Sequence, residues 1–210
     1  MTVAHALDPG DEIEIPFESD KASEAYEIIV GKCRKTFRML EPQNGGKLTA
    51  DLALLELDTG RCSVDNTITL SRRRLRLKIY KGETIPHDDH SVMILDQYGK
   101  IQKGRISEEG LTDNHITDYA EGLHDVLGIC ADHASTKRKK TGTKRKRITG
   151  KGDSGALVMS RPNTQTDFVY VYGIVIGTYS IGKDESLTIA NTLRKVIPGV
   201  FHDRQEVDFA

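Results

Sequence analysis

The 210-residue sequence contains no run of apolar residues long enough to cross a bilayer, and it has no tryptophan. A membrane-spanning helix needs about 20 consecutive, predominantly apolar residues, so the sequence does not predict one. With 37% apolar and 29% charged residues, the composition is that of an ordinary soluble globular protein. The length suffices for one large domain or two small ones with a substantial core.

Two further absences concern the cellular compartment. The N-terminal residues Met1–His5 lack the positively charged and then hydrophobic segments of a secretory signal. The three cysteines, Cys33, Cys62 and Cys130, are odd in number and widely spaced, which does not suit a disulfide framework. Free thiols in a reducing compartment are therefore expected, and the sequence predicts an intracellular protein, cytoplasmic or nuclear, without a membrane partner.

Charge of both signs is present, but it is unevenly distributed. Of the 30 basic residues, eight lie in the eleven positions from Lys137 to Arg147, and the other 22 stand against 31 acidic residues, a net charge of −9. Such a run is either a mobile, solvated loop or a patch that contacts acidic partners or nucleic acid, and both interpretations stay open. The run contains no aromatic residue, so stacking on bases is not indicated.

Short apolar or alternating segments separated by turn residues predict an all-β chain. Glu12–Phe17 and Leu75–Ile79 alternate polar and apolar residues, as half-buried strands do. Val92–Leu95 and Ile101–Ile106 flank a Gly-containing turn and predict a hairpin. Further strands are expected at Tyr26–Leu40, Leu52–Leu57, Asp125–Cys130, Ala156–Met159 and Phe168–Gly177.

One helix is predicted near the end of the chain. Its apolar face is formed by residues spaced as i, i+4, i+7 and i+8, namely Ile189, Leu193, Val196 and Ile197. Arg194 and Lys195 are expected toward its C-terminal end, where cations are favoured, and Pro198-Gly199 should stop it.

Three short segments carry the residue types of nucleophilic catalysis: Thr2–Ala6 with His5, Asp51–Leu55 with Asp51, and Gly152–Ala156 with Ser154. A nucleophilic serine needs a base within hydrogen-bond reach, and the base needs a carboxylate to fix its tautomer and stabilise its imidazolium. The segments resemble the catalytic motifs of the chymotrypsin-like serine proteases, which have the trypsin fold, and they occur in that family's order. The order is informative because unrelated folds build the same site with Ser or Asp first.

The resemblance implies two β-barrels and a closing helix. Residues 1–80 would form the N-terminal barrel with His5 and Asp51, and residues 81–210 the C-terminal barrel with Ser154 and the helix, together one peptidase domain. Only four residues precede His5, where the family has several strands, so we expect an incomplete first barrel. Ala6 follows His5, so the disulfide that secreted relatives carry beside this histidine is absent.

The resemblance also implies the role of each residue in a serine endopeptidase that works through an acyl-enzyme, with neither cofactor nor metal. Ser154 would be the nucleophile, His5 the general base and then acid, and Asp51 the orienting carboxylate. The backbone N–H groups of Gly152 and Ser154 would form the oxyanion hole, to which each donor typically contributes about 2.7–4 kcal/mol. A glycine at position 152 lets its amide face the substrate without a clashing Cβ.

Peptide or protein substrates would contact the strand pair that follows the serine. In the family the edge of that pair binds the substrate backbone, which assigns Ile176 and Gly177 to substrate binding. An ungapped count of six residues before Ser154 places Ile148 at the floor of the side-chain pocket, which argues against a preference for Lys or Arg. Asp153 pairs in secreted relatives with an N-terminus released by zymogen cleavage, and no such terminus is identifiable here.

Two other functional classes remain open. One is a catalytically inactive protease-fold protein that binds peptides, which an incomplete first barrel favours. The other is a nuclear, nucleic-acid-associated protein that acts through Lys137–Arg147. A metal site is not indicated by His87 and His90 with their intervening aspartates, because no further ligand cluster accompanies them, and a polar loop is expected there.

Overall fold

The computed structural model describes residues 6–18, 25–41, 45–60, 65–86, 90–96, 99–113, 122–131, 148–150, 152–181 and 185–201. The chain forms two compact units. Unit 1 comprises Met1–Arg38 and Asp51–Asp65, and unit 2 comprises Met39–Ala50 and Asn66–Ala210.

Unit 1 is built on a three-stranded sheet in the order β1 (Glu12–Glu18), β2 (Ala25–Leu40) and β3 (Leu48–Leu57). β1 runs antiparallel to β2, with an irregular register between Ile13 and Glu14. Gly31 of β2 is packed so closely that a Cβ there would collide with the carbonyl oxygen of Glu56, which explains glycine at this strand position.

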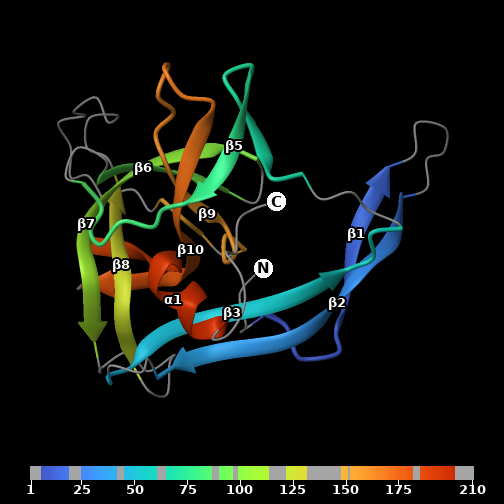
Figure 1. Ribbon diagram of the computed structural model, residues 1–210, viewed down its shortest axis with the longest axis horizontal. Coiled ribbons are helices and arrows are strands. Elements are labelled where there is room, and N and C mark those ends of the chain that lie inside the picture. The colour runs from blue at the N-terminus through green and yellow to red at the C-terminus, as the bar shows by residue number, and fades with distance from the viewer. Residues whose placement is uncertain are drawn as a thin grey trace. The chain divides into compact units, whose positions relative to one another are not determined.

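Unit 2 contains a closed barrel of six strands (Figure 1). Its neighbours follow the order β11-β8-β7-β6-β9-β10, and an additional pairing of β10 with β11 closes the ring, every pairing being antiparallel. The strands are β6 (Ser91–Leu95), β7 (Ile101–Asp113), β8 (Leu123–Ala131), β9 (Leu157–Ser160), β10 (Phe168–Ile181) and β11 (Glu185–Thr192).

A hairpin of two more strands extends the sheet beyond β10 (Figure 1). β5 (Arg73–Ile79) pairs in parallel with β10, and β4 (Thr67–Leu70) pairs antiparallel with β5. Both residues of the connecting turn, Ser71 and Arg72, have positive φ, at 49° and 66°. That combination matches the type I′ turn, whose twist suits two-residue hairpins.

The barrel is filled by apolar side chains from alternate strand positions, as its closure requires. The main cluster comprises Ile85, Val92, Ile94, Ile106, Leu127, Ile129, Val158, Tyr172, Val175 and Ala190. Helix α1 (Leu193–Val200) follows β11 directly and buries Leu193 and Val196. Among the described residues, no helix has both the length and the apolar character needed to cross a bilayer.

The prediction of an all-β chain with a C-terminal helix is confirmed, and the structure has one closed barrel. A second barrel and a trypsin-like fold stay predictions. Two local expectations were wrong. Ile189 lies in β11 rather than in the helix, and Pro198 lies inside α1 rather than after it. The barrel ladder takes Ile189 because it pairs with Gly128 of β8, which outweighs the helical spacing of the apolar residues.

The strand that carries Asp51 also differs from expectation. β3 begins at Leu48, four residues earlier than the predicted start at Leu52, so Asp51 lies within the strand rather than just before it. Within unit 2, the residues just before Asp51 are tied to other segments. The Thr49 side chain accepts a hydrogen bond from the His124 N–H at 2.9 Å, and the Ala50 carbonyl accepts one from the Asn191 side chain at 2.6 Å.

Candidate functional site

Ser154 lies in a tight loop that leads into β9. The loop needs two glycines in the left-handed region, Gly152 with φ of 96° and Gly155 with φ of 94°, a conformation that side chains disfavour. The Asp153 carboxylate accepts a hydrogen bond from the Gly150 N–H at 2.7 Å, and the Ala156 N–H donates to the Asp153 carbonyl at 3.0 Å. Asp153 is buried, so its carboxylate stabilises the loop through a hydrogen bond that is shielded from solvent.

The loop is fixed to β10 by two reciprocal backbone hydrogen bonds. The Gly155 N–H donates to the Val175 carbonyl at 2.8 Å, and the Val175 N–H donates to the Ala156 carbonyl at 2.8 Å. The register of β10 against β11 is irregular between Val175 and Gly177. β10 therefore sets the position of Ser154 and bends next to it.

Ser154 lines a pocket of about 240 Å³. The described residues that line it are all uncharged: Thr149, Gly150, Gly152, Ser154, Val175, Gly177 and Thr178. A Cβ built on Gly177 would meet no atom within 4 Å, so the absence of a side chain there leaves space open. The pocket brings together three of the residues that the sequence assigns to function, Gly152, Ser154 and Gly177.

The backbone amides around Ser154 differ in their hydrogen bonding. The N–H groups of Asp153, Gly155 and Ala156 each donate to a backbone carbonyl. Within the described part of the chain, the N–H groups of Gly152 and Ser154 have no acceptor. The two amides that the resemblance assigns to an oxyanion hole are therefore available to donate a hydrogen bond to a ligand.

A row of threonine hydroxyls supports one wall of this pocket. The Thr149 hydroxyl lies 3.0 Å from the Thr178 hydroxyl and 2.7 Å from that of Thr188 on β11. Thr149 and Thr188 are buried, so these contacts satisfy polar groups that would otherwise be costly to desolvate. The wall is polar without carrying charge.

The other residues predicted for function lie elsewhere or outside the description. Ile148 packs against the barrel core, and Ile176 is buried, and neither is among the residues that line the pocket. Asp51 belongs to unit 1, where it is 1% exposed and has a positive φ of 39°. His5 lies outside the described residues, so the convergence of His5, Asp51 and Ser154 stays a prediction.

Three further sequence expectations concern residues that lie wholly or partly outside the described ranges. The basic run Lys137–Arg147 does so entirely, and so does Cys62, whereas Cys33 and Cys130 are free thiols. His87 is not described, although His90 is. No group of three or more potential metal ligands occurs among the described residues.

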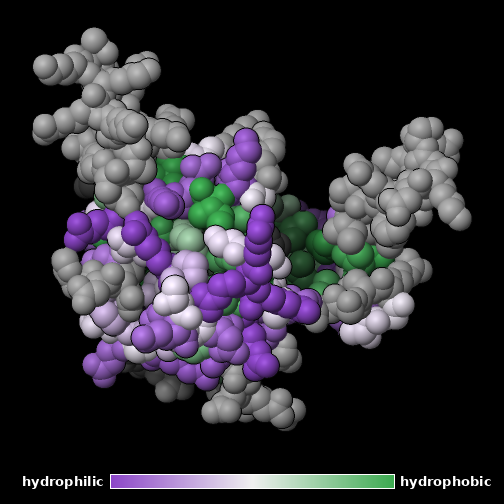
Figure 2. Space-filling view, turned by 90° about the horizontal axis from the view of Figure 1, so that it is seen from above, coloured by the Kyte–Doolittle hydropathy of each residue, from purple (hydrophilic) through white to green (hydrophobic). Residues whose placement is uncertain are grey.

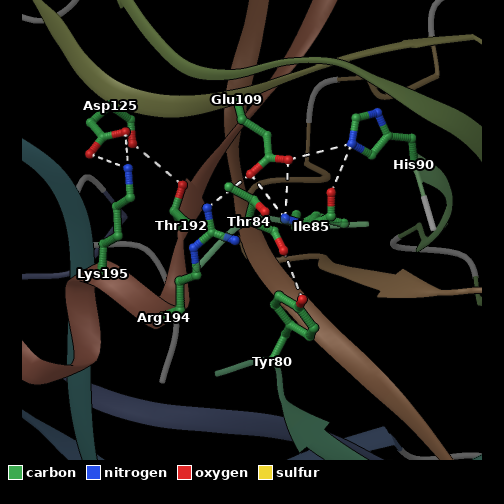
Figure 3. Close-up of polar contacts among 9 residues, drawn as sticks. All are labelled: Tyr80, Thr84, Ile85, His90, Glu109, Asp125, Thr192, Arg194 and Lys195. Carbon is green, nitrogen blue, oxygen red and sulfur yellow. Dashed lines mark hydrogen bonds and ion pairs between the residues drawn. The ribbon is translucent and has the colours of Figure 1, made fainter. Parts of the chain in front are cut away.

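A polar cluster that the sequence did not reveal lies around Glu109 of β7 (Figure 3). The Glu109 carboxylate binds the Arg194 guanidinium at 2.9 Å, accepts from the Ile85 N–H at 3.2 Å, and lies 3.4 Å from His90 Nε2. His90 Nε2 is also 3.1 Å from the Ile85 carbonyl. Since a carboxylate and a carbonyl both only accept, this nitrogen carries the proton.

The expected position of Arg194 and Lys195 in the helix was wrong. Arg194 and Lys195 are the second and third residues of α1 rather than members of its last turn. They are held there by acidic partners on the barrel, Glu109 for Arg194 and Asp125 for Lys195 (Figure 3). Specific ion pairs thus outweigh the weaker preference of cations for a helix C-terminus. No sequence signal pointed to Glu109, because its partners are up to 85 residues away.

The fold and pocket define an all-β protein with a closed six-stranded barrel, a terminal helix and a pocket, uncharged in its described residues, beside a glycine-flanked serine. No protein-family model matches the chain, and no curated protein matches it either.

Proposed function

We propose that this chain is a serine endopeptidase. Ser154 acts as the nucleophile, His5 as the general base and then acid, and Asp51 as the carboxylate that orients His5. The observation that carries the proposal is the setting of Ser154. It lies on a tight, glycine-flanked loop, lines a pocket, and is close to two backbone N–H groups that have no acceptor among the described residues.

The reaction follows from these roles. The Ser154 hydroxyl attacks the scissile carbonyl while His5 takes its proton, and the Gly152 and Ser154 N–H groups stabilise the negative charge on the carbonyl oxygen. His5 then gives the proton to the departing amine, which leaves an acyl-enzyme. A water molecule, deprotonated by His5, releases the acyl group and restores Ser154.

The pocket supports a preference for a small, uncharged side chain next to the scissile bond. A charged side chain entering this pocket of about 240 Å³ would lose hydration without gaining an ionic partner among the described lining residues, which are glycines, threonines, Ser154 and Val175. Neither Ile148 nor Ile176 is among them, but the uncharged character of these residues agrees with the argument against Lys or Arg.

A fluorophosphonate probe tests the nucleophile. We expect the folded full chain to be labelled, and Ser154→Ala to abolish labelling. Ser107→Ala is the matched control, because Ser107 is more exposed than the half-buried Ser154 but its hydroxyl donates to the Gly128 carbonyl on the barrel, so this variant should leave labelling unchanged. Mass spectrometry of the labelled peptide should locate the adduct in residues 152–156.

A peptide-binding protein without catalysis is the alternative that the pocket also allows. His5→Ala separates the two, because a general base raises the reactivity of Ser154 by about 10²–10⁴-fold. An enzyme should lose labelling in this variant. Labelling that is absent from the well-folded parent, together with measurable peptide binding, would reject the endopeptidase in favour of the binding protein.

A further inference from the structure

One face of the β4–β5 hairpin and the adjoining part of β10 carries cationic, hydroxyl and aromatic side chains side by side. Alternate residues of β5 point to solvent, so that Arg74, Arg76 and Lys78 are all exposed. Leu75 and Ile79, on the other face, are buried, and Leu77 is half-buried. Because alternate strand residues are about 6.6–6.8 Å apart, the three cations form an evenly spaced row.

The neighbouring strands complete this face with other residue types. By register, Thr67 and Thr69 of β4 lie opposite Arg76 and Arg74. On the other side, Phe168 and Tyr170 of β10 pair with Arg76 and Lys78. The cation face, as we call it, comprises Thr67, Thr69, Arg74, Arg76, Lys78, Phe168 and Tyr170. Within this face, the Arg74 Nε–H donates a hydrogen bond to the Thr67 hydroxyl at 2.9 Å.

Both aromatic rings are partly exposed, and Tyr170 also packs against the barrel core and lies edge-to-face with Tyr80 at 5.4 Å. Phe168 and Tyr170 are half-buried, and their ring centroids are 5.1 Å apart in an edge-to-face arrangement. The Lys78 ammonium lies 4.3 Å from the centre of the Phe168 ring. Figure 2, which looks down on the end of the molecule where the hairpin projects in Figure 1, shows strongly hydrophilic residues next to smaller hydrophobic patches.

We propose that the cation face binds single-stranded nucleic acid. A row of cations neutralises successive phosphates, and the exposed parts of the two aromatic rings on the adjacent strand allow bases to stack. Threonine hydroxyls on the other side can donate to phosphate or sugar oxygens. An acidic peptide would use the cations but would gain nothing specific from the two rings, so the combination favours nucleic acid. The proposal uses none of the residues of Lys137–Arg147 and does not depend on the proposed peptidase.

The test is fluorescence anisotropy of the full chain with labelled oligo-dT of roughly fifteen nucleotides, about the upper site size of a single-strand-binding surface. Arg76→Gln/Lys78→Gln should weaken binding about tenfold and flatten the slope of log K against log salt by about 1.4, since each phosphate contact on a single strand contributes about 0.7. Phe168→Leu should also weaken binding severalfold but leave the salt slope unchanged, because it removes stacking and no charge.

Lys100→Gln/Lys103→Gln is the matched control. It removes the same charge from β7 and the turn before it, and two strands separate β7 from β10 in either direction around the barrel. This control should change the affinity for oligo-dT by no more than about twofold. The thermal stability of every variant should match that of the parent, which shows that each one is folded. An equal loss of affinity in the control would mean that only the overall charge of the chain matters, and it would overturn the proposal. The proposal would also fail if a glutamate-rich peptide bound as tightly as oligo-dT and Phe168→Leu left that binding unchanged, because the face would then be a surface for acidic peptides.

Discussion

Two consecutive residues of α1 form ion pairs in very different surroundings (Figure 3). The Arg194 side chain is 9% exposed and its partner Glu109 21%, whereas Lys195 and Asp125 are 38% and 32% exposed. Glu109 also binds Ile85 and lies beside His90, so it joins three segments, while Asp125 meets Lys195 at 2.6 Å through both carboxylate oxygens. The shorter contact is not the stronger one in such a comparison, because water screens an exposed pair.

The largest effect is expected from Glu109→Ala. It leaves the buried Arg194 guanidinium without its carboxylate and the Ile85 N–H without its acceptor. The free energy of unfolding should fall by about 3 kcal/mol, at the low end for breaking a buried pair. Urea denaturation followed by circular dichroism measures this. Glu109→Gln is the matched control and should cost less, since its amide oxygen still accepts a hydrogen bond.

Asp125 allows the ion pair to be separated from backbone strain. Its φ is 56°, where a residue with a Cβ is disfavoured by about 1–2 kcal/mol. Asp125→Ala and Asp125→Gly both remove the contact with Lys195, but only glycine relieves the strain. Asp125→Gly should therefore be about 1 kcal/mol more stable than Asp125→Ala in the same denaturation experiment. Equal stabilities would mean that the left-handed conformation carries no penalty here.

Lys195→Ala should have a smaller effect, about 0.2–1 kcal/mol, as exposed pairs do. The loss should shrink further in high salt, because the Debye length falls from about 10 Å at 0.1 M to 3 Å at 1 M. Measuring the variant and its parent at both ionic strengths sharpens the contrast with Glu109→Ala, whose cost should persist in salt. A salt-insensitive loss at Lys195 would contradict the role assigned to exposure.

The smallest effect is expected at Tyr179, whose hydroxyl donates to Asp113 at 2.9 Å. This hydrogen bond to Asp113 raises the pKa of Tyr179 above its usual value of 10. Because the folded-state pKa is raised, the contribution to stability is fully present below about pH 10 and is lost as pH rises through the higher folded-state value. Tyr179→Phe should therefore destabilise the protein slightly at pH 7 and not at high pH. An equal difference at both pH values would exclude the hydrogen bond as its source.

The sequence predicted the elements of unit 2 better than their contacts. Alternation located β5, and the apolar run at Phe168–Gly177 located most of β10, because core-facing side chains determine these patterns. The closure of the barrel by β10 and β11 was beyond reach, since it depends on pairing between strands rather than on any local pattern. The contacts of Glu109 could not be predicted either, because its neighbours in sequence do not indicate that its side chain is partly buried.

The candidate site divides in a similar way. Gly152 and Ser154 could be predicted because a sharp loop leaves a local signature of glycines. Gly177 followed from the resemblance and lines the same pocket. The threonine wall could not be foreseen, because Thr149, Thr178 and Thr188 come from three separate segments. Ile148 shows the limit of counting along the chain, since packing against the core draws its side chain away from the pocket lining.

Strand β10 carries more than one of the features described above. Val175 holds the Ser154 loop and Gly177 lines the pocket, while Phe168 and Tyr170 lie on the cation face at the other end of the strand. A single-residue insertion or deletion in β10 reverses the side-chain alternation beyond it. Length changes within this strand would therefore disturb the pocket and the cation face together, whereas length changes in surface loops would be absorbed locally. Because the pocket and the cation face share this strand, either can change independently by substitution but not by insertion or deletion within β10.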